Sequence, residues 1–113
     1  MSFDLWPEIQ TAIRDTEYLV ANMRDRGREK SEAEARYYTV KARRAFALKE
    51  AGHPVTFITL VIKGDEEVNA AMRDFHAREV EYDNAREAVM CSKKKLDTLR
   101  EQMQREWSQA GQR

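Results

Sequence analysis

Glycine and proline are scarce in this chain, and this scarcity constrains the fold more than any other feature of the sequence. The 113 residues include four glycines and two prolines. Apart from Gly27, these residues fall near the two ends or between positions 52 and 64. Because glycine and proline most often interrupt regular structure, two long helices are expected, one on each side of that region.

The ends of both helices carry recognisable signals. Asp4 and Pro7 suit the first turn of a helix that we place at about residues 5–51. Gly52 is expected to end this helix as a left-handed residue. Asp65 can accept the free amide protons of a second helix, placed at about residues 65–109. Gly27 costs about 1 kcal/mol relative to alanine inside a helix, which leaves a kink or break there as an alternative.

Apolar residues recur along both helices with the spacing of a coiled-coil seam. In the second helix an apolar residue recurs at every seventh position. A second set of small or apolar residues lies between these positions and is interrupted by Arg78 and Glu106. The first helix has two weaker stripes, the later one interrupted by Arg44. The positions are Phe75, Tyr82, Val89, Leu96 and Met103 with Ala71, Ala85, Ser92 and Leu99, and, in the first helix, Ile9, Ile13, Thr16, Val20 and Met23, then Ala33, Tyr37, Val40, Ala47 and Ala51.

Two arms of equal length and a short joint predict an all-α fold, an antiparallel long-helix hairpin forming one domain over residues 1–113. A joint centred on the apolar segment would pair residues whose numbers add up to about 116. Trp6 and Trp107 would then pack together at the open end of the hairpin. A lone helix pair buries little surface, so we expect a homodimer that forms a helical bundle.

The connector, about residues 52–64, contains the densest apolar segment of the chain, "VTFITLVI" at 55–62. Thr56, Thr59 and Lys63 would share one face of a short helix, which favours a helix, while the β-branched residues keep a strand as the alternative. Either form needs cover from the hairpin or from another subunit. The candidate partner-binding residues are Phe57, Ile58, Leu60, Val61 and Ile62.

Composition excludes several classes of protein. Twenty basic and twenty acidic residues cancel, so no global charge attracts nucleic acid or a membrane. The apolar segment is too short to span a bilayer, and "MSFDLWPEIQ" lacks the basic start and apolar core of a secretory signal. A single cysteine, Cys91, fits a reducing cytoplasm.

Several landmarks resemble those of a known group of proteins. A long helix ends in "LKEAGHPVT", "KGDEEV" opens a second one, and "QREW" lies near its end. Over residues 35–107 this arrangement resembles small uncharacterised helical-hairpin proteins of tailed phages and prophages. The resemblance implies a phage accessory protein in the cytoplasm of a bacterial host, associated with early replication or recombination genes. It offers no catalytic residue to transfer.

Patterns that could carry chemistry are incomplete. His76, Glu79 and Asp83 lie one turn apart, but a di-metal carboxylate site needs more converging ligands. "DEEVNAAM" has Ala70 where helical nucleotide pyrophosphatases carry a third carboxylate. Cys91 has no histidine at a suitable spacing to activate it. We therefore expect a non-enzymatic protein without metal, cofactor or small-molecule substrate.

Charged runs supply a further candidate. In the predicted register, basic residues of both helices form one band beside an acidic band made of Glu29, Glu32 and Glu34 with Glu79, Glu81, Asp83 and Glu87. A basic band could hold a nucleic-acid backbone, although exposed helix faces ordinarily carry such residues. Two main hypotheses follow, a protein-interaction adaptor acting on a phage or host protein and a nucleic-acid-binding accessory factor in phage recombination or replication. An enzyme with an unrecognised carboxylate site is a third, weaker alternative. The possible nucleic-acid contacts are Arg24, Arg26, Arg28, Lys93, Lys94 and Lys95.

Overall fold

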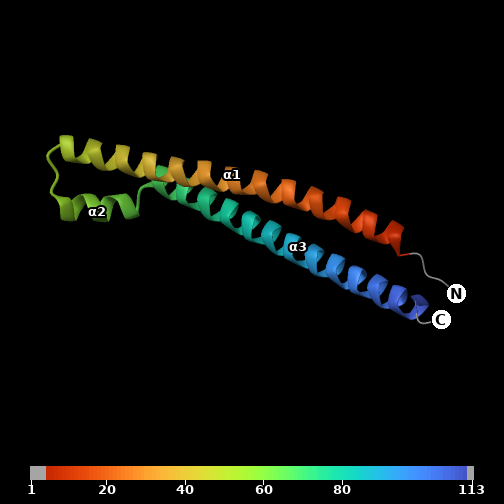
Figure 1. The fold of residues 1–113 in the computed structure, drawn as a ribbon. Coiled ribbons are helices and arrows are strands. Elements are labelled where there is room, and N and C mark those ends of the chain that lie inside the picture. The colour runs from red at the N-terminus through yellow and green to blue at the C-terminus, as the bar shows by residue number, and fades with distance from the viewer. Residues whose placement is uncertain (1–4, 112–113) are drawn as a thin grey trace. The chain divides into compact units, whose positions relative to one another are not determined.

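The computed structural model describes residues 5–111, and this range contains three helices and no strand. They are α1 (Trp6–Glu50), α2 (Val55–Lys63) and α3 (Glu66–Gly111). The predicted all-α helical hairpin is confirmed, with α1 and α3 as its antiparallel arms (Figure 1). The apolar segment is helical, which decides between the two predicted alternatives. Within residues 5–111, no helix combines the length and the apolar character needed to cross a membrane.

Contacts divide the chain into two units, each containing part of α1 and part of α3. The terminal unit consists of the described parts of Met1–Arg24 and Asp83–Arg113. The connector unit is Asp25–Tyr82 and includes α2. Each unit has its own apolar core.

The core of the terminal unit forms where the two helices face each other. Leu5, Ile9, Ala12 and Leu96 are buried there, and Ile13, Leu99 and Met103 pack against them. A polar contact crosses the same seam, since the Thr16 hydroxyl lies 2.6 Å from that of Ser92. Thr16 already donates to the carbonyl of Ala12 at 2.7 Å, so Ser92 is the donor between the two hydroxyls.

The core of the connector unit joins all three helices. Ile58 and Ile62 of α2 are buried with Val68 of α3. Val40, Ala45 and Leu48 of α1 pack against this cluster. Further along the same unit, the rings of Tyr37 and Phe75 meet edge to face with centroids 6.2 Å apart. The apolar segment therefore finds part of its cover within its own chain.

The predicted seams agree with the observed burial, except near the end of α1. Every seam position of α3 from Ala71 to Met103 is buried or half-buried, and Arg78 and Glu106 are half-buried as well. The first stripe of α1 is likewise covered. Ala47 and Ala51 were predicted to lie on the seam but are exposed. Ala45 and Leu48 pack instead, against a cluster to which α2 contributes Ile58 and Ile62.

The predicted register of the two arms is wrong by about two helical turns. In the terminal unit Thr16 lies opposite Ser92, and in the connector unit Arg36 meets Asp74 and Arg44 meets Asp65. The numbers of each pair add up to between 108 and 110, not to 116. The reason is that the chain reverses before the apolar segment, which belongs to the returning arm as α2.

No break occurs at Gly27, because α1 is continuous from Trp6 to Glu50. A side chain at this position would approach the ring of Tyr82, since a Cβ atom would lie 3.3 Å from Tyr82 Cε2. The absence of a side chain at Gly27 thus lets an aromatic ring of α3 lie against the backbone of α1.

Candidate functional site on the connecting helix

The turn before α2 determines where the chain reverses. Gly52 has a φ of 89°, in the left-handed region that was predicted for it. Its amide donates to the carbonyl of Lys49, and the amide of His53 donates to that of Leu48, which together form a Schellman motif. The His53 ring then lies 4.6 Å from the ring of Phe57, between centroids. Pro54 follows in an extended conformation and α2 begins at the next residue.

The junction between α2 and α3 is held by Asp65. One oxygen of this carboxylate accepts the amide proton of Val68 at 3.0 Å, as expected of a residue that caps a helix. The other oxygen accepts from Nε of Arg44, on α1, at 2.7 Å. The Val68 amide, and secondly the Arg44 guanidinium, keep the pKa of Asp65 below its usual value. A single side chain therefore starts α3 and ties it to α1.

The five candidate partner-binding residues of α2 do not all face the same way. Ile58 and Ile62 are buried against α1 and α3 and are not available to a partner, which corrects this part of the prediction. Phe57 and Leu60 are exposed, with 43% and 69% of their surface accessible, and Val61 is half-buried. Because Phe57, Leu60 and Val61 are spaced three and four residues apart, they share one side of the helix. We call these three residues the outer face of α2.

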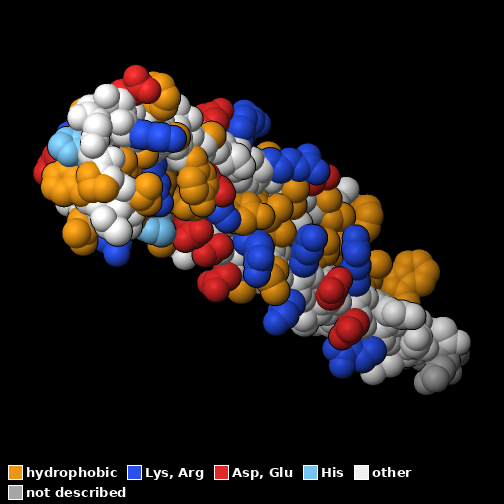
Figure 2. Space-filling model, turned by 90° about the vertical axis from the view of Figure 1, so that its left-hand side faces the viewer, with side chains coloured by type: hydrophobic (Ala, Val, Ile, Leu, Met, Phe, Trp, Pro, Cys, Tyr) orange, Lys and Arg blue, Asp and Glu red, His pale blue; other side chains and the backbone are white. Residues whose placement is uncertain are grey.

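Other apolar residues of the connector unit are exposed as well. Val55, the first residue of α2, is 76% exposed, and Phe46 of α1 is 64% exposed. Figure 2 looks onto this end of the molecule and shows hydrophobic side chains gathered over it, with basic ones among them. Sequence reasoning missed Phe46, although it falls outside both predicted stripes of α1 and could have been recognised as exposed for that reason.

The six residues of the predicted basic band belong to different units. Lys93, Lys94, Lys95 and Arg24 are in the terminal unit, whereas Arg26 and Arg28 are in the connector unit. Ser92, the residue just before the three lysines, contacts Thr16 of α1. Thr16 lies eight residues before Arg24, so the lysines are not opposite Arg24. Their pairing with Arg24 was therefore based on the wrong register.

Acidic groups accompany several of these basic residues. Arg26 lies 3.1 Å from Glu29 and Arg28 lies 3.1 Å from Asp25, both as ion pairs along α1. Lys95 lines a groove of the terminal unit together with Glu8 and Asp15. For Lys93 and Lys94, residues 5–111 contain no carboxylate within ion-pair distance.

The predicted acidic band is also changed by the register. In the connector unit, Glu29 and Glu32 of α1 line a groove together with Arg78 of α3, and Arg36 of α1 pairs with Asp74 of α3 at 3.2 Å. Glu81 pairs with Arg78 on its own helix at 2.8 Å. Charges of opposite sign therefore face one another where the prediction placed two acidic runs together.

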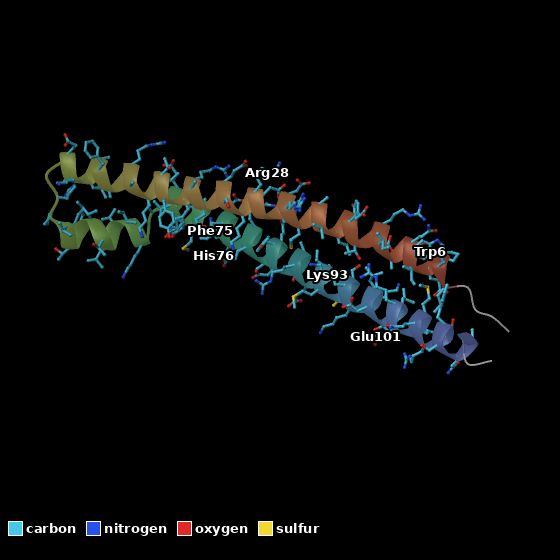
Figure 3. The ribbon with its side chains drawn as sticks, in the orientation of Figure 1. Trp6, Arg28, Phe75, His76, Lys93 and Glu101 are labelled. Atoms are coloured by element: carbon cyan, nitrogen blue, oxygen red, sulfur yellow. The ribbon has the colours of Figure 1, made fainter. Side chains whose placement is uncertain are left out.

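The remaining sequence candidates lie at exposed positions. His76 Nδ1 is 3.6 Å from Glu79 Oε1 on the outside of α3, beside Phe75 (Figure 3). In the described part of the chain, no three side chains of the metal-binding types converge. Cys91 is exposed. Trp6 and Trp107, predicted to pack together, are 51% and 74% exposed, and Leu5, Ile9 and Leu96 form the core at this end.

Comparisons with known proteins gave no match, whether with family models, with curated proteins or with solved structures.

Proposed function

We propose that this protein is a non-enzymatic, phage-type interaction or adaptor protein that binds its partner through the outer face of α2. The observation that carries the proposal is the distribution of apolar residues around this nine-residue helix. Ile58 and Ile62 are buried against α1 and α3, and Phe57 and Leu60 remain accessible to solvent. An apolar helix face that the fold does not use is a common binding surface.

The surroundings of the outer face support this role. Thr56, Thr59 and Lys63 are exposed along the neighbouring side of α2. A polar margin around an apolar centre is the usual composition of a protein interface that also exists uncovered. Aromatic residues such as Phe57 often provide much of the binding energy at such interfaces. The partner we propose is a phage or host protein, and a second copy of the chain is one form that it could take.

Affinity capture from infected bacterial cells tests the proposal. The wild-type protein is compared with Leu60→Glu, which places a charge on the outer face, and with the control Tyr18→Glu, which changes an equally exposed residue of the terminal unit. A partner identified with wild type should be lost with Leu60→Glu and retained with the control. Sedimentation of the same three proteins shows whether the partner is a second copy. Equal capture by all three would contradict the proposal.

A nucleic-acid-binding accessory factor is the second candidate, favoured by the exposed and unpaired Lys93 and Lys94. The acidic groups beside Lys95 weigh against it, because they repel phosphate. Binding to single-stranded DNA over a salt series provides the test. This function requires binding at low salt that disappears when Lys93, Lys94 and Lys95 are changed together to glutamate.

A further inference from the structure

A groove opens in the connector unit where the three helices meet. It has a volume of about 400 Å³ and is lined by Tyr37 and Lys41 of α1, Ile62 and Lys63 of α2, and Val68 and Met72 of α3. Its size falls near the lower end of the range typical of ligand pockets. The helices leave this space because α2 ends at Lys63 and the chain turns at Gly64 before α3 begins.

The floor of this groove is apolar and well supported. Ile62 and Val68 keep only 8% and 3% of their surfaces exposed and belong to the unit's core. Tyr37 and Met72 are half-buried beside them. Methionine adapts its shape easily and is frequent at surfaces that accept apolar side chains of a partner.

Two basic side chains stand at the edge of the groove. No aspartate or glutamate lines it. Lys41 and Lys63 are exposed, and within residues 5–111 neither has a carboxylate at ion-pair distance. Lys41 Nζ lies 5.7 Å from the centre of the Tyr37 ring. The ammonium groups thus remain able to bind a negative charge from outside.

Two other polar groups of the groove already donate hydrogen bonds within the protein. The amide of the Asn69 side chain donates to the carbonyl of Lys63 at 3.1 Å, and the Thr59 hydroxyl donates to that of Val55 at 3.0 Å. A second groove of the connector unit differs, since Arg26, Arg36 and Arg78 line it together with Glu29, Glu32 and Asp74. Charges of both signs are present there, whereas the charged residues that line the groove at Lys41 and Lys63 are all basic.

We propose that this groove binds an acidic peptide segment of the partner, with one large apolar side chain on the floor and flanking carboxylates at Lys41 and Lys63. This inference rests on the proposed interaction function and specifies the chemistry of the partner. The volume admits one or two side chains, and the two lysines select carboxylates beside them by charge complementarity.

The test uses the full chain with methionine methyl groups labelled for NMR. The probe is a capped peptide with the order Glu-Glu-Phe-Glu-Glu, with one control peptide in which glutamine replaces every glutamate and another in which serine replaces phenylalanine. Met72 lines the groove, and Met23, Met90 and Met103 belong to the terminal unit and serve as references. The acidic peptide should shift the Met72 methyl signal with an affinity on the order of 0.1–1 mM and leave the references unchanged.

Variants then test the two lysines. Lys41→Glu and Lys63→Glu should each weaken peptide binding at least about tenfold, and Lys41→Arg should retain it, because the positive charge and not the shape of lysine is required. Lys49→Glu is the matched control, since it makes the same charge change on α1 outside the groove. Circular dichroism of each variant verifies that the helices remain formed.

The outcomes separate this inference from the proposed function. No Met72 shift at low salt, or an equal shift with the glutamine peptide, would overturn the acidic-peptide site. If partner capture were still lost with Leu60→Glu in that case, the proposed function would stand and the partner would bind the outer face alone. If the peptide bound but capture did not depend on Leu60, the groove would be real and the proposed use of the outer face wrong.

Discussion

The terminal unit and the connector unit differ in the contacts that hold α1 against α3. The terminal unit has a seam of two helices, in which Ile9 is 2% exposed and a hydroxyl pair crosses at Thr16. The connector unit has a third helix in its core, and two ion pairs, Arg36–Asp74 and Arg44–Asp65, join α1 to α3. Apolar stripes bring the arms together in both units, and the polar contacts that cross between the arms differ, a hydroxyl pair in one unit and ion pairs in the other.

The largest effect should come from the apolar core of the terminal unit. Ile9→Ala removes side-chain atoms from a buried site and should lower the free energy of unfolding by about 3 kcal/mol. If the two units open independently, hydrogen exchange should accelerate in the terminal unit and stay unchanged around α2. Equal acceleration in both units would show that the division by contacts has no counterpart in stability.

The hydroxyl pair should contribute less than the core. Thr16→Val removes the acceptor of Ser92 and should cost about 1 kcal/mol, because a part-buried donor is left without its partner. Combining it with Ser92→Ala should cost less than the two single changes added together. Denaturant unfolding of the four proteins measures this coupling. Simple additivity would mean that the pair does not help to hold the register.

Gly27 tests close packing in the connector unit. Gly27→Ala should gain about 1 kcal/mol from helix propensity, but its Cβ would press on the Tyr82 ring, so the net change should stay within about 0.5 kcal/mol. The gain should appear in full when Tyr82→Leu is the background. Thermal unfolding of both pairs distinguishes the contributions. A full gain in the Tyr82 background would show that the ring moves aside at no cost.

The smallest effect should be that of Asp65, because Arg44, its partner in the ion pair, is exposed to solvent. Asp65→Asn keeps an oxygen for the Val68 amide and removes the charge that pairs with Arg44. The pKa of Asp65 is lower in the folded state than in the unfolded state. The wild-type protein should therefore melt at a higher temperature than the variant, by a constant margin, at pH values above the unfolded-state pKa of 3.8. This margin should disappear as the pH falls through the folded-state pKa, which lies below 3.8. Melting temperatures of both proteins from pH 7 down to pH 2 test this, and an advantage unchanged at pH 2 would contradict it.

Much of the fold could be predicted because local chemistry determines it. Gly52 marks the end of α1 because glycine can adopt a left-handed conformation. Asp65 marks the start of α3 because its carboxylate accepts a free amide proton of that helix. The structure confirms both. The spacing of apolar residues indicates which side of α3 is covered. The spacing does not indicate which element covers that side. For this reason Ala47 was predicted to lie on the seam, whereas Ala45 and Leu48 make the contacts with α2.

The candidate site was predicted less well than the fold. The composition of the apolar segment identified α2, but it could not show which of its residues the hairpin itself covers. Which residues are covered depends on where the chain reverses. If the reversal moved by a few residues, different side chains of α2 would be buried. The groove at Lys41 and Lys63 was beyond sequence reasoning, because residues from three helices form it.

The turn at Gly52 has a consequence for chirality. Its φ of 89° belongs to the mirror-image half of backbone space, and, apart from Gly52 and its two neighbours, no atom of residues 5–111 lies within 4 Å of the place where a Cβ would be. An ordinary alanine would be strained there by its own handedness and not by crowding. A chemically synthesised chain with D-alanine at this position should accept the turn without strain and fold more stably, because fewer conformations of the unfolded chain would be lost.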